Sequence, residues 1–102
     1  MVKEKFRTLY VVDPTHDVSI AKDYSESVVF ISSGDEQIED LEDRMMRILF
    51  SFDPRQDAII PMGKVTVCLL TGIVLGRLFP FDKIAFGVYK DGEYKFIRVR
   101  SN

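Results

Sequence analysis

The sequence contains a single histidine, and the residues beside it define the chemistry that it could perform. His16 lies in the segment Asp13-Pro14-Thr15-His16-Asp17, where carboxylates stand on both sides of the imidazole. An imidazole next to carboxylates can act as a general base or contribute to a metal site. The alternative is a loop residue in a turn shaped by the neighbouring Asp and Pro, and we favour this alternative.

Cys68 is the only cysteine, and it lies among the apolar residues Val67, Leu69 and Leu70. A single thiol cannot form an intrachain disulfide, and one Cys with one His falls short of the roughly four ligands of a structural zinc site. We interpret Cys68 as a buried thiol in a reducing compartment. A nucleophile–base pair of Cys68 and His16 would require a buried helix to meet a loop. The sequence therefore predicts no catalytic residues, no metal site and no cofactor.

Two glycine turns stand where parallel sheets usually bind ligands, between a strand and the following helix. They are Ser33-Gly34 and Met62-Gly63. Neither the Gly-x-Gly-x-x-Gly pattern nor the P-loop pattern occurs, and Asp35 and Glu36 would repel a phosphate at the first turn. We therefore do not expect a nucleotide site.

These residues must be positioned by strands and helices that the apolar pattern predicts. Strands are expected at 5–12, 28–31 and 58–60, and a hairpin at 84–100, because Asp91-Gly92 suits a type I′ turn. Apolar residues at steps of three and four predict an amphipathic helix from a Ser33/Glu36 capping box to Phe52. The segment 64–79 could be strand or helix, and we predict a helix that Pro80 ends.

The middle of the chain resembles a repeat of two strand–helix units, 28–56 and 57–86. The offset is 29 residues, since Gly34 falls on Gly63, and Leu49-Phe50-Ser51-Phe52-Asp53 falls on Leu78-Phe79-Pro80-Phe81-Asp82. The alternative is chance similarity in a chain rich in Phe and Leu. A true repeat would favour the helical interpretation of 64–79.

Together these elements predict one domain, 1–102, of the α+β or α/β class. We expect a small mixed β-sheet with two helices, built on the two related strand–helix motifs, with a groove between them. Strand–helix–strand order implies parallel pairing with right-handed crossovers. The first strand and the closing hairpin are expected as antiparallel edges.

The second helix is predicted to be apolar on every side, unlike the amphipathic first helix. Either the N-terminal strand and loop cover it, or it leaves an exposed apolar patch of the kind that marks an interaction surface. Gly72 and Gly76 lie one turn apart, so another helix could approach closely there.

Charge and hydropathy bear on where the protein works. The net charge is −2, and the charged N-terminus has no apolar segment behind it. The most apolar stretch, Val65 to Gly76, is shorter than the roughly 20 residues of a bilayer span. We expect an intracellular, soluble protein that is neither secreted nor bound to a membrane.

The two ends of the chain are basic. If the terminal strands are neighbours, they form a patch that could bind nucleic acid, with Tyr94 and Phe96 as stacking surfaces. The basic residues of this alternative are Lys5, Arg7, Lys95, Arg98 and Arg100. Basic edge strands also protect a sheet from aggregation, and the acidic pI of about 5.3 argues against this alternative.

The layout, the scarcity of Asn and Gln, the lone Cys68 and the lack of a catalytic signature resemble small orphan proteins of filamentous viruses that infect hyperthermophilic archaea. This resemblance implies a viral, heat-adapted protein in the host cytoplasm or the virion, and it assigns no functional residue.

The sequence as a whole predicts a non-enzymatic protein–protein interaction module. We expect it to bind a protein or a peptide segment, in the groove between the two motifs or along a sheet edge, and it could form a homo-oligomer. The expected partner-binding residues are Phe52, Phe81, Gly72 and Gly76. Nucleic-acid binding is the alternative function.

Overall fold

The computed structural model describes residues 5–13, 19–32 and 37–100. The strands are β1 (Phe6–Val11), β2 (Ser25–Phe30), β3 (Asp57–Ile60), β4 (Lys83–Lys90) and β5 (Glu93–Arg100), and the helices are η1 (Ser19–Asp23, a 3-10 helix), α1 (Ile38–Leu49) and α2 (Val65–Leu78). They form a mixed sheet of five strands in the order β2-β1-β3-β4-β5. The predicted α+β fold with a small mixed sheet and two helices is confirmed.

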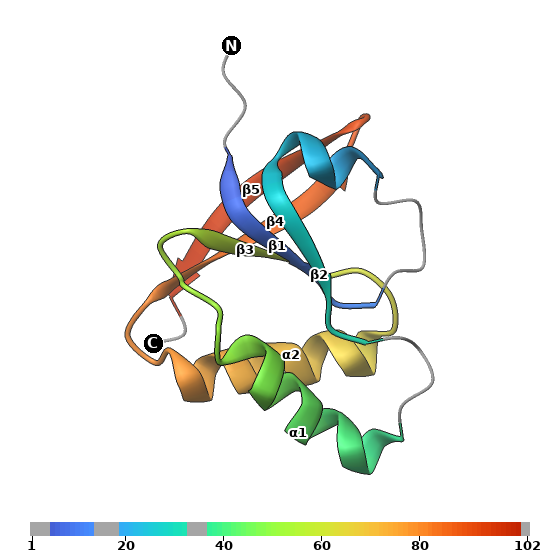
Figure 1. Ribbon diagram of the computed structural model, residues 1–102, viewed down its shortest axis with the longest axis vertical. Helices are drawn as coiled ribbons and strands as arrows, with labels where there is room; N and C mark the ends of the chain where they lie inside the picture. The colour runs from blue at the N-terminus through green and yellow to red at the C-terminus, as the bar shows by residue number, and fades with distance from the viewer. Residues whose placement is uncertain (1–4, 14–18, 33–36, 101–102) are drawn as a thin grey trace.

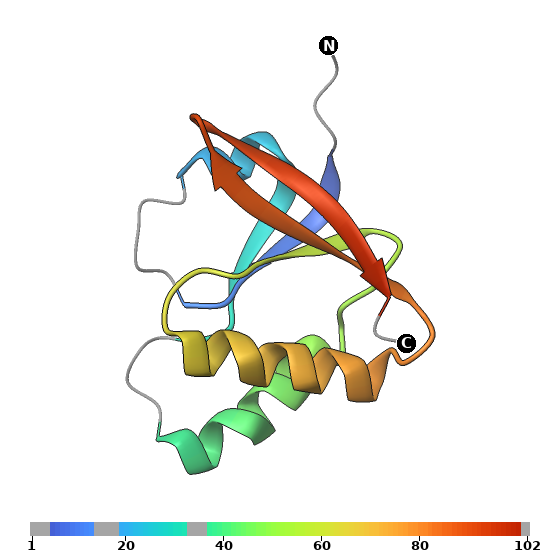
Figure 2. The same cartoon turned by 180° about the vertical axis from the view of Figure 1, so that it is seen from behind.

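Both α-helices lie on the same side of the sheet, as the two opposite views show (Figures 1 and 2). Their apolar side chains meet the sheet in one core, which includes Met45 and Leu49 of α1, Val74 of α2 and Ile59 of β3. The other side of the sheet packs against η1 and the aromatic residues of the curled β4–β5 hairpin, forming a second core. The sheet is therefore covered by different kinds of structure on its two faces.

Strand β1 occupies the middle of the parallel part of the sheet, paired with β2 on one side and β3 on the other. Its predicted position as an antiparallel edge is therefore wrong. The physical reason is that Leu9, Tyr10 and Val11 are all buried, and a strand buried on both faces is stable only inside a sheet. Among the described strands only β5 runs antiparallel to its neighbour, and β2 and β5 are the two edge strands.

The predicted helices and hairpin are present within a few residues of their expected bounds. Segment 64–79 is helical as predicted, and α2 ends before Pro80. The hairpin turn has φ of +54° at Asp91 and +82° at Gly92, as a type I′ turn requires. Helix α1 begins at Ile38, and its N-cap residue, Gln37, makes no side-chain capping bond. The expected capping box of Ser33 and Glu36 lies outside the described residues.

The internal repeat is not confirmed. Two pairs of phenylalanines that the sequence alignment superposes occupy different environments. Phe50 is 79% exposed whereas its counterpart Phe79 is half-buried, and Phe52 is 3% exposed whereas its counterpart Phe81 is 81% exposed. The similarity at the two helix ends therefore does not correspond to equivalent packing.

Candidate functional site

Helix α2 presents an apolar side to solvent, which we call the outer face of α2. Its residues follow one another at steps of three, four or one along the helix: Val65, Leu69, Gly72, Ile73 and Gly76. The three large side chains are 73%, 64% and 53% exposed at Val65, Leu69 and Ile73. An exposed group of large apolar side chains on one element is the usual mark of an interaction surface.

The exposure of this face follows from the position of the helix. Val67, Thr71, Val74 and Leu75 are buried on the opposite side of α2. Figure 2 shows α2 in front of α1, so α1 does not cover its outer side. The interpretation in which the N-terminal strand and loop cover α2 is wrong for the strand, because β1 lies within the sheet and Leu69 and Ile73 stay exposed. Residues 14–18 of the loop lie outside the described residues.

The two glycines leave the backbone of this face open. A Cβ placed on Gly72 or on Gly76 would have no atom within 4 Å, apart from the backbone of its own helix and the neighbouring residues. Each glycine therefore forms a shallow depression beside the projecting side chains of Leu69 and Ile73. Large residues next to small ones give the outer face of α2 a surface into which another helix can interlock.

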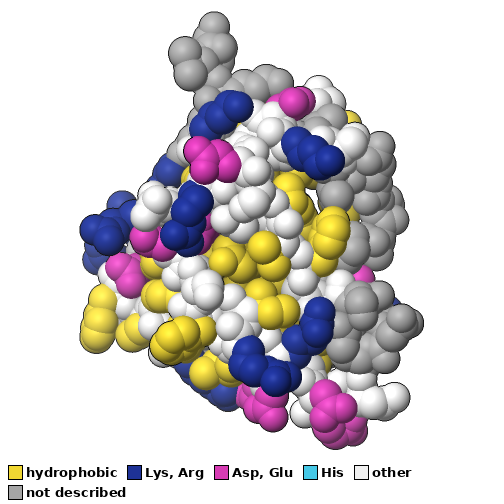
Figure 3. Space-filling model, viewed as in Figure 1, with side chains coloured by type: hydrophobic (Ala, Val, Ile, Leu, Met, Phe, Trp, Pro, Cys, Tyr) yellow, Lys and Arg dark blue, Asp and Glu magenta, His cyan; other side chains and the backbone are white. Residues whose placement is uncertain are grey.

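The four predicted partner-binding residues do not lie together. Phe52 is in the core, where its ring centroid lies 5.4 Å from that of Tyr10 and 5.6 Å from that of Phe79. A partner cannot reach it in this structure. Phe81, by contrast, is exposed in the connection from α2 to β4. Hydrophobic side chains gather on the surface near the C-terminal ends of both helices (Figure 3).

Side chains fill the space between the helices at the predicted groove. The Thr71 hydroxyl of α2 donates to the carbonyl of Val67 at 2.8 Å and lies 3.7 Å from the Met45 sulfur of α1. At the surface Arg77 of α2 forms an ion pair with Glu42 of α1. The helices therefore pack directly against each other here.

The basic residues predicted to bind nucleic acid do not lie on neighbouring strands. Strands β1 and β5 are separated in the sheet by β3 and β4, so the terminal strands are not paired neighbours. The curl of the hairpin nevertheless brings the Arg98 guanidinium to 5.8 Å from the ring centroid of Phe6. Lys5, Lys95 and Arg100 are exposed.

The Arg7 guanidinium is paired with the carboxylate of Asp57. Its Nε donates to a carboxylate oxygen of Asp57 at 3.0 Å, and its Nη2 donates to the carbonyl of Ser51 at 3.1 Å. The hydrogen bond to Asp57, followed by the attraction between the two charges, raises the pKa of the Arg7 guanidinium. The charge of Arg7 is therefore largely compensated by Asp57, although the Arg7 side chain is 42% exposed.

Of the two residues considered for catalysis, Cys68 and His16, the structure describes only Cys68. Cys68 is half-buried rather than fully buried, and its Sγ lies 3.8 Å from the carbonyl oxygen of Met62. Burial, with a smaller contribution from the charge of Asp13, raises the pKa of this thiol, which disfavours the reactive thiolate. His16 lies outside the described residues. Within those residues, no three His, Cys, Asp or Glu side chains are grouped as a metal site.

Comparison with known proteins identifies no relative: no family model, no curated protein and no solved structure matches the chain. The resemblance to viral proteins therefore stays a prediction. In the part of the chain that the structure describes, neither α-helix combines the length and hydropathy needed to cross a membrane.

Asp57 was not among the functional residues predicted from the sequence, although its carboxylate makes several hydrogen bonds. It is completely buried and accepts hydrogen bonds from Arg7, from the Thr8 N–H at 3.2 Å and from the Asp53 N–H at 2.8 Å. The only signal in the sequence was a carboxylate placed directly before the apolar strand residues Ala58, Ile59 and Ile60. Its role is structural, since it joins β1 and β3.

Proposed function

We propose that the protein is a non-enzymatic protein–protein interaction module that binds through the outer face of α2. One observation carries this proposal: Val65, Leu69 and Ile73 are each more than half exposed on one side of a single helix. A partner that covers these side chains removes apolar surface from water, which contributes about 25 cal/mol of favourable free energy for each Å² covered. The two open glycines allow that partner to approach closely.

A second copy of the chain fits this surface. Two α2 helices crossing antiparallel about an axis between residues 72 and 73 bring Leu69 of one copy opposite Gly76 of the other, because these positions are equally far from the axis. The same axis brings Ile73 opposite Gly72. Both large side chains thus meet a glycine, where Gly72 and Gly76 have open space around them. Such a match of projections and depressions is what close helix packing requires.

The ends of the helix are also compatible with this arrangement. The axis directs Lys64, which precedes α2, toward the segment that follows α2 in the second copy. Phe81 in that segment is 81% exposed, and an aromatic ring is a favourable neighbour for a lysine ammonium. Lys64 is itself exposed. In this dimer Phe81 keeps the partner-binding role that the sequence predicted, whereas Phe52 does not.

Sedimentation equilibrium of the purified chain over a range of concentrations tests this proposal. We expect a dimer for the wild type, a monomer for Leu69→Lys and a dimer for the control Ile97→Lys. Ile97 is a suitable control because it is similarly exposed, at 55%, but lies on β5. Circular dichroism establishes that each variant is folded. A wild type that stays monomeric at every concentration, or a Leu69→Lys variant that still dimerises, would contradict the proposal.

Nucleic-acid binding is the second candidate, favoured by the approach of Arg98 to the aromatic ring of Phe6. The Phe6 ring is buried, but the exposed Arg98 guanidinium that lies against it can contact a phosphate or stack on a base. Arg7 contributes less because Asp57 already neutralises it. Fluorescence anisotropy with a labelled single-stranded oligonucleotide tests this candidate, which requires binding that weakens steeply with salt. Arg98→Ala should reduce that binding, and the Leu69→Lys variant should retain it.

A further inference from the structure

The sheet opens between β3 and β4 at the end where β3 stops. These two strands are paired only at Ala58 with Ala85 and at Ile59 with Phe86, whereas β4 continues to Lys90. The residue that would extend the pairing is Pro61, which has no N–H to donate. We call the space between segments 60–63 and 87–90 the wedge.

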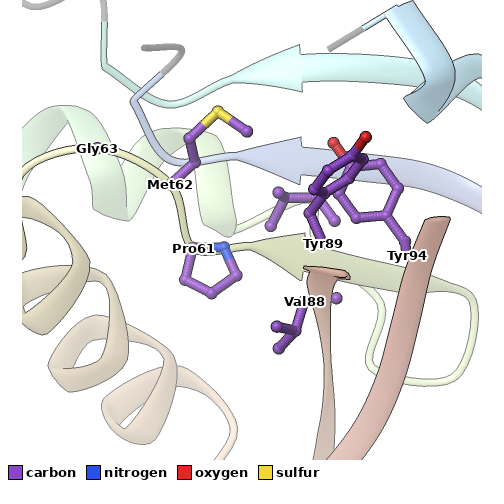
Figure 4. Close-up of a pocket in the computed structure, with 8 residues that line it drawn as sticks. Pro61, Met62, Gly63, Val88, Tyr89 and Tyr94 are labelled. Atoms are coloured by element: carbon purple, nitrogen blue, oxygen red, sulfur yellow. The ribbon is translucent and has the colours of Figure 1, made fainter. Parts of the chain in front are cut away.

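The chain after β3 is held to β1, which keeps the wedge open. The N–H of Val12 donates to the carbonyl of Ile60 at 3.1 Å, and the N–H of Asp13 donates to that of Met62 at 3.0 Å. Gly63 then turns with φ of +104°, and a Cβ at this position would lie only 2.4 Å from the Cβ of Asp13. A glycine is therefore needed for the chain to follow β1, while β4 runs off at a steep angle (Figure 4).

The edge of β4 that borders the wedge has backbone groups available for pairing. In a two-residue hairpin the residues next to the turn, Lys90 and Glu93, form a hydrogen-bonded pair, and such pairs alternate along the strands. Val88 is therefore bonded to its β5 partner, Lys95. By the same alternation, the N–H and C=O of Tyr89 point away from β5 toward the wedge, where no residue of β3 is paired with Tyr89.

An apolar cavity of about 340 Å³ lies in the wedge. On one side it is lined by Ile60, Pro61 and Met62, and on the other by Val88, Tyr89 and Tyr94. The two tyrosine rings are in edge contact, with centroids 5.6 Å apart, and form one wall of the cavity (Figure 4). Tyr94 is buried, but Tyr89 is 57% exposed, so this wall can be extended by an apolar ligand group.

We propose that the wedge binds an extended peptide segment, which adds to β4 as a new strand and places an aromatic or branched aliphatic side chain in the cavity. Free backbone groups beside an apolar cavity are the two parts of this mode of recognition: backbone pairing provides affinity, and the cavity selects the side chain. A small apolar molecule would use the cavity but leave the N–H of Tyr89 unpaired. The wedge and the outer face of α2 belong to different elements, so this inference goes beyond the proposed function.

The other edges of the sheet are less suited to an apolar peptide. The outer edge strand β5 carries exposed Lys95, Arg98 and Arg100, and charged edge residues discourage strand addition. The cavity beside the edge strand β2 has the charged side chains of Lys22 and Glu26 in its lining. The lining of the wedge, by contrast, contains no charged side chain.

Hydrogen exchange followed by NMR tests the first half of the inference on the free, full-length chain. We expect the amide of Tyr89 to exchange much faster than the amide of Val88, because only Val88 is bonded to β5. Equal protection of the two amides would show that the edge of β4 is not free, and would overturn the proposal.

Peptide binding tests the second half. A library of random octapeptides displayed on phage is the probe, and the selected peptides are synthesised for titration. We expect them to share one aromatic or branched aliphatic position and to protect the amide of Tyr89. Methylating the peptide nitrogen that faces β4 should abolish binding, whereas methylating the next nitrogen should not. Selection of no peptide, or equal tolerance of both methylations, would overturn the proposal.

Two variants locate the site. Tyr89→Ala, which removes a wall of the cavity, should weaken binding of the selected peptides at least tenfold, and the control Ile97→Ala should leave it unchanged. Equal effects of the two changes would overturn the proposal. The variant Leu69→Lys should bind the peptides normally, because Leu69 is not part of the wedge. Dimerisation through α2 and peptide binding in the wedge are therefore tested separately.

Discussion

Arg7 of β1 donates two hydrogen bonds, from Nε and Nη2, to the buried carboxylate of Asp57 at the start of β3. The remaining capacity of that carboxylate is used by the N–H groups of Thr8 and Asp53. Asp57 thereby joins two neighbouring parallel strands to the turn after α1. A buried carboxylate is tolerated in such a position only when it is paired and hydrogen-bonded.

Removing this carboxylate should destabilise the fold strongly. We expect Asp57→Ala to lower the free energy of unfolding by about 2–5 kcal/mol, because it leaves two backbone N–H groups without their acceptor and removes the partner of the half-exposed Arg7. Urea denaturation followed by circular dichroism measures the loss. The control is Asp82→Ala, an exposed aspartate, which should change stability by no more than about 0.5 kcal/mol. Similar stabilities for the two variants would contradict the role assigned to Asp57.

The two phenylalanines that the sequence aligned should respond differently to truncation. Phe52→Ala should cost about 3–5 kcal/mol, because the side chain is 3% exposed and packs against Tyr10 and Phe79. Phe81→Ala should leave the stability of the monomer nearly unchanged, because that ring is 81% exposed. Thermal and urea unfolding of both variants check this. Equal losses would mean that the two positions are packed alike, as in a true repeat.

Replacing either glycine of α2 by alanine should stabilise the monomer but weaken its association into a dimer. Gly72→Ala and Gly76→Ala should each raise the free energy of unfolding of the monomer by about 0.5–1 kcal/mol, since a Cβ meets open space and alanine favours the helix. In the proposed dimer the same Cβ occupies the depression that receives Ile73 or Leu69, so sedimentation equilibrium should show weaker association. More stable variants that dimerise as well as the wild type would place the interface elsewhere.

Cys68 should make the fold sensitive to alkaline pH. Burial, helped by the charge of Asp13, raises the pKa of its thiol in the folded chain. As the pH rises past the ordinary value of a thiol, the unfolded chain loses this proton first, so stability present at neutral pH is lost. Urea titrations over this range should show a smaller loss for Cys68→Ser than for the wild type. Alkylation of Cys68 should also be slower in the folded chain than in urea, and Asp13→Asn should accelerate it.

Local residue patterns were sufficient for much of the fold. Apolar residues at steps of three and four identified α1, and Asp91-Gly92 identified the hairpin, because each of these signals arises from contacts between near neighbours in sequence. The position of β1 could not be read in this way. A strand of six residues carries little information about which strands flank it, and only the crossover of the chain through η1 and α1 put β1 between β2 and β3.

The same division applies to the surfaces. Composition and spacing were enough to predict that α2 is apolar on every side and carries two glycines one turn apart, since these are local properties. Packing in the folded chain was needed to establish that Leu69 and Ile73 face solvent while Val67 and Val74 face the core, because α1 and the sheet together cover one side of the helix. The same packing creates the wedge, because Pro61 ends the pairing of β3 with β4 and Gly63 lets the chain follow β1 instead of β4.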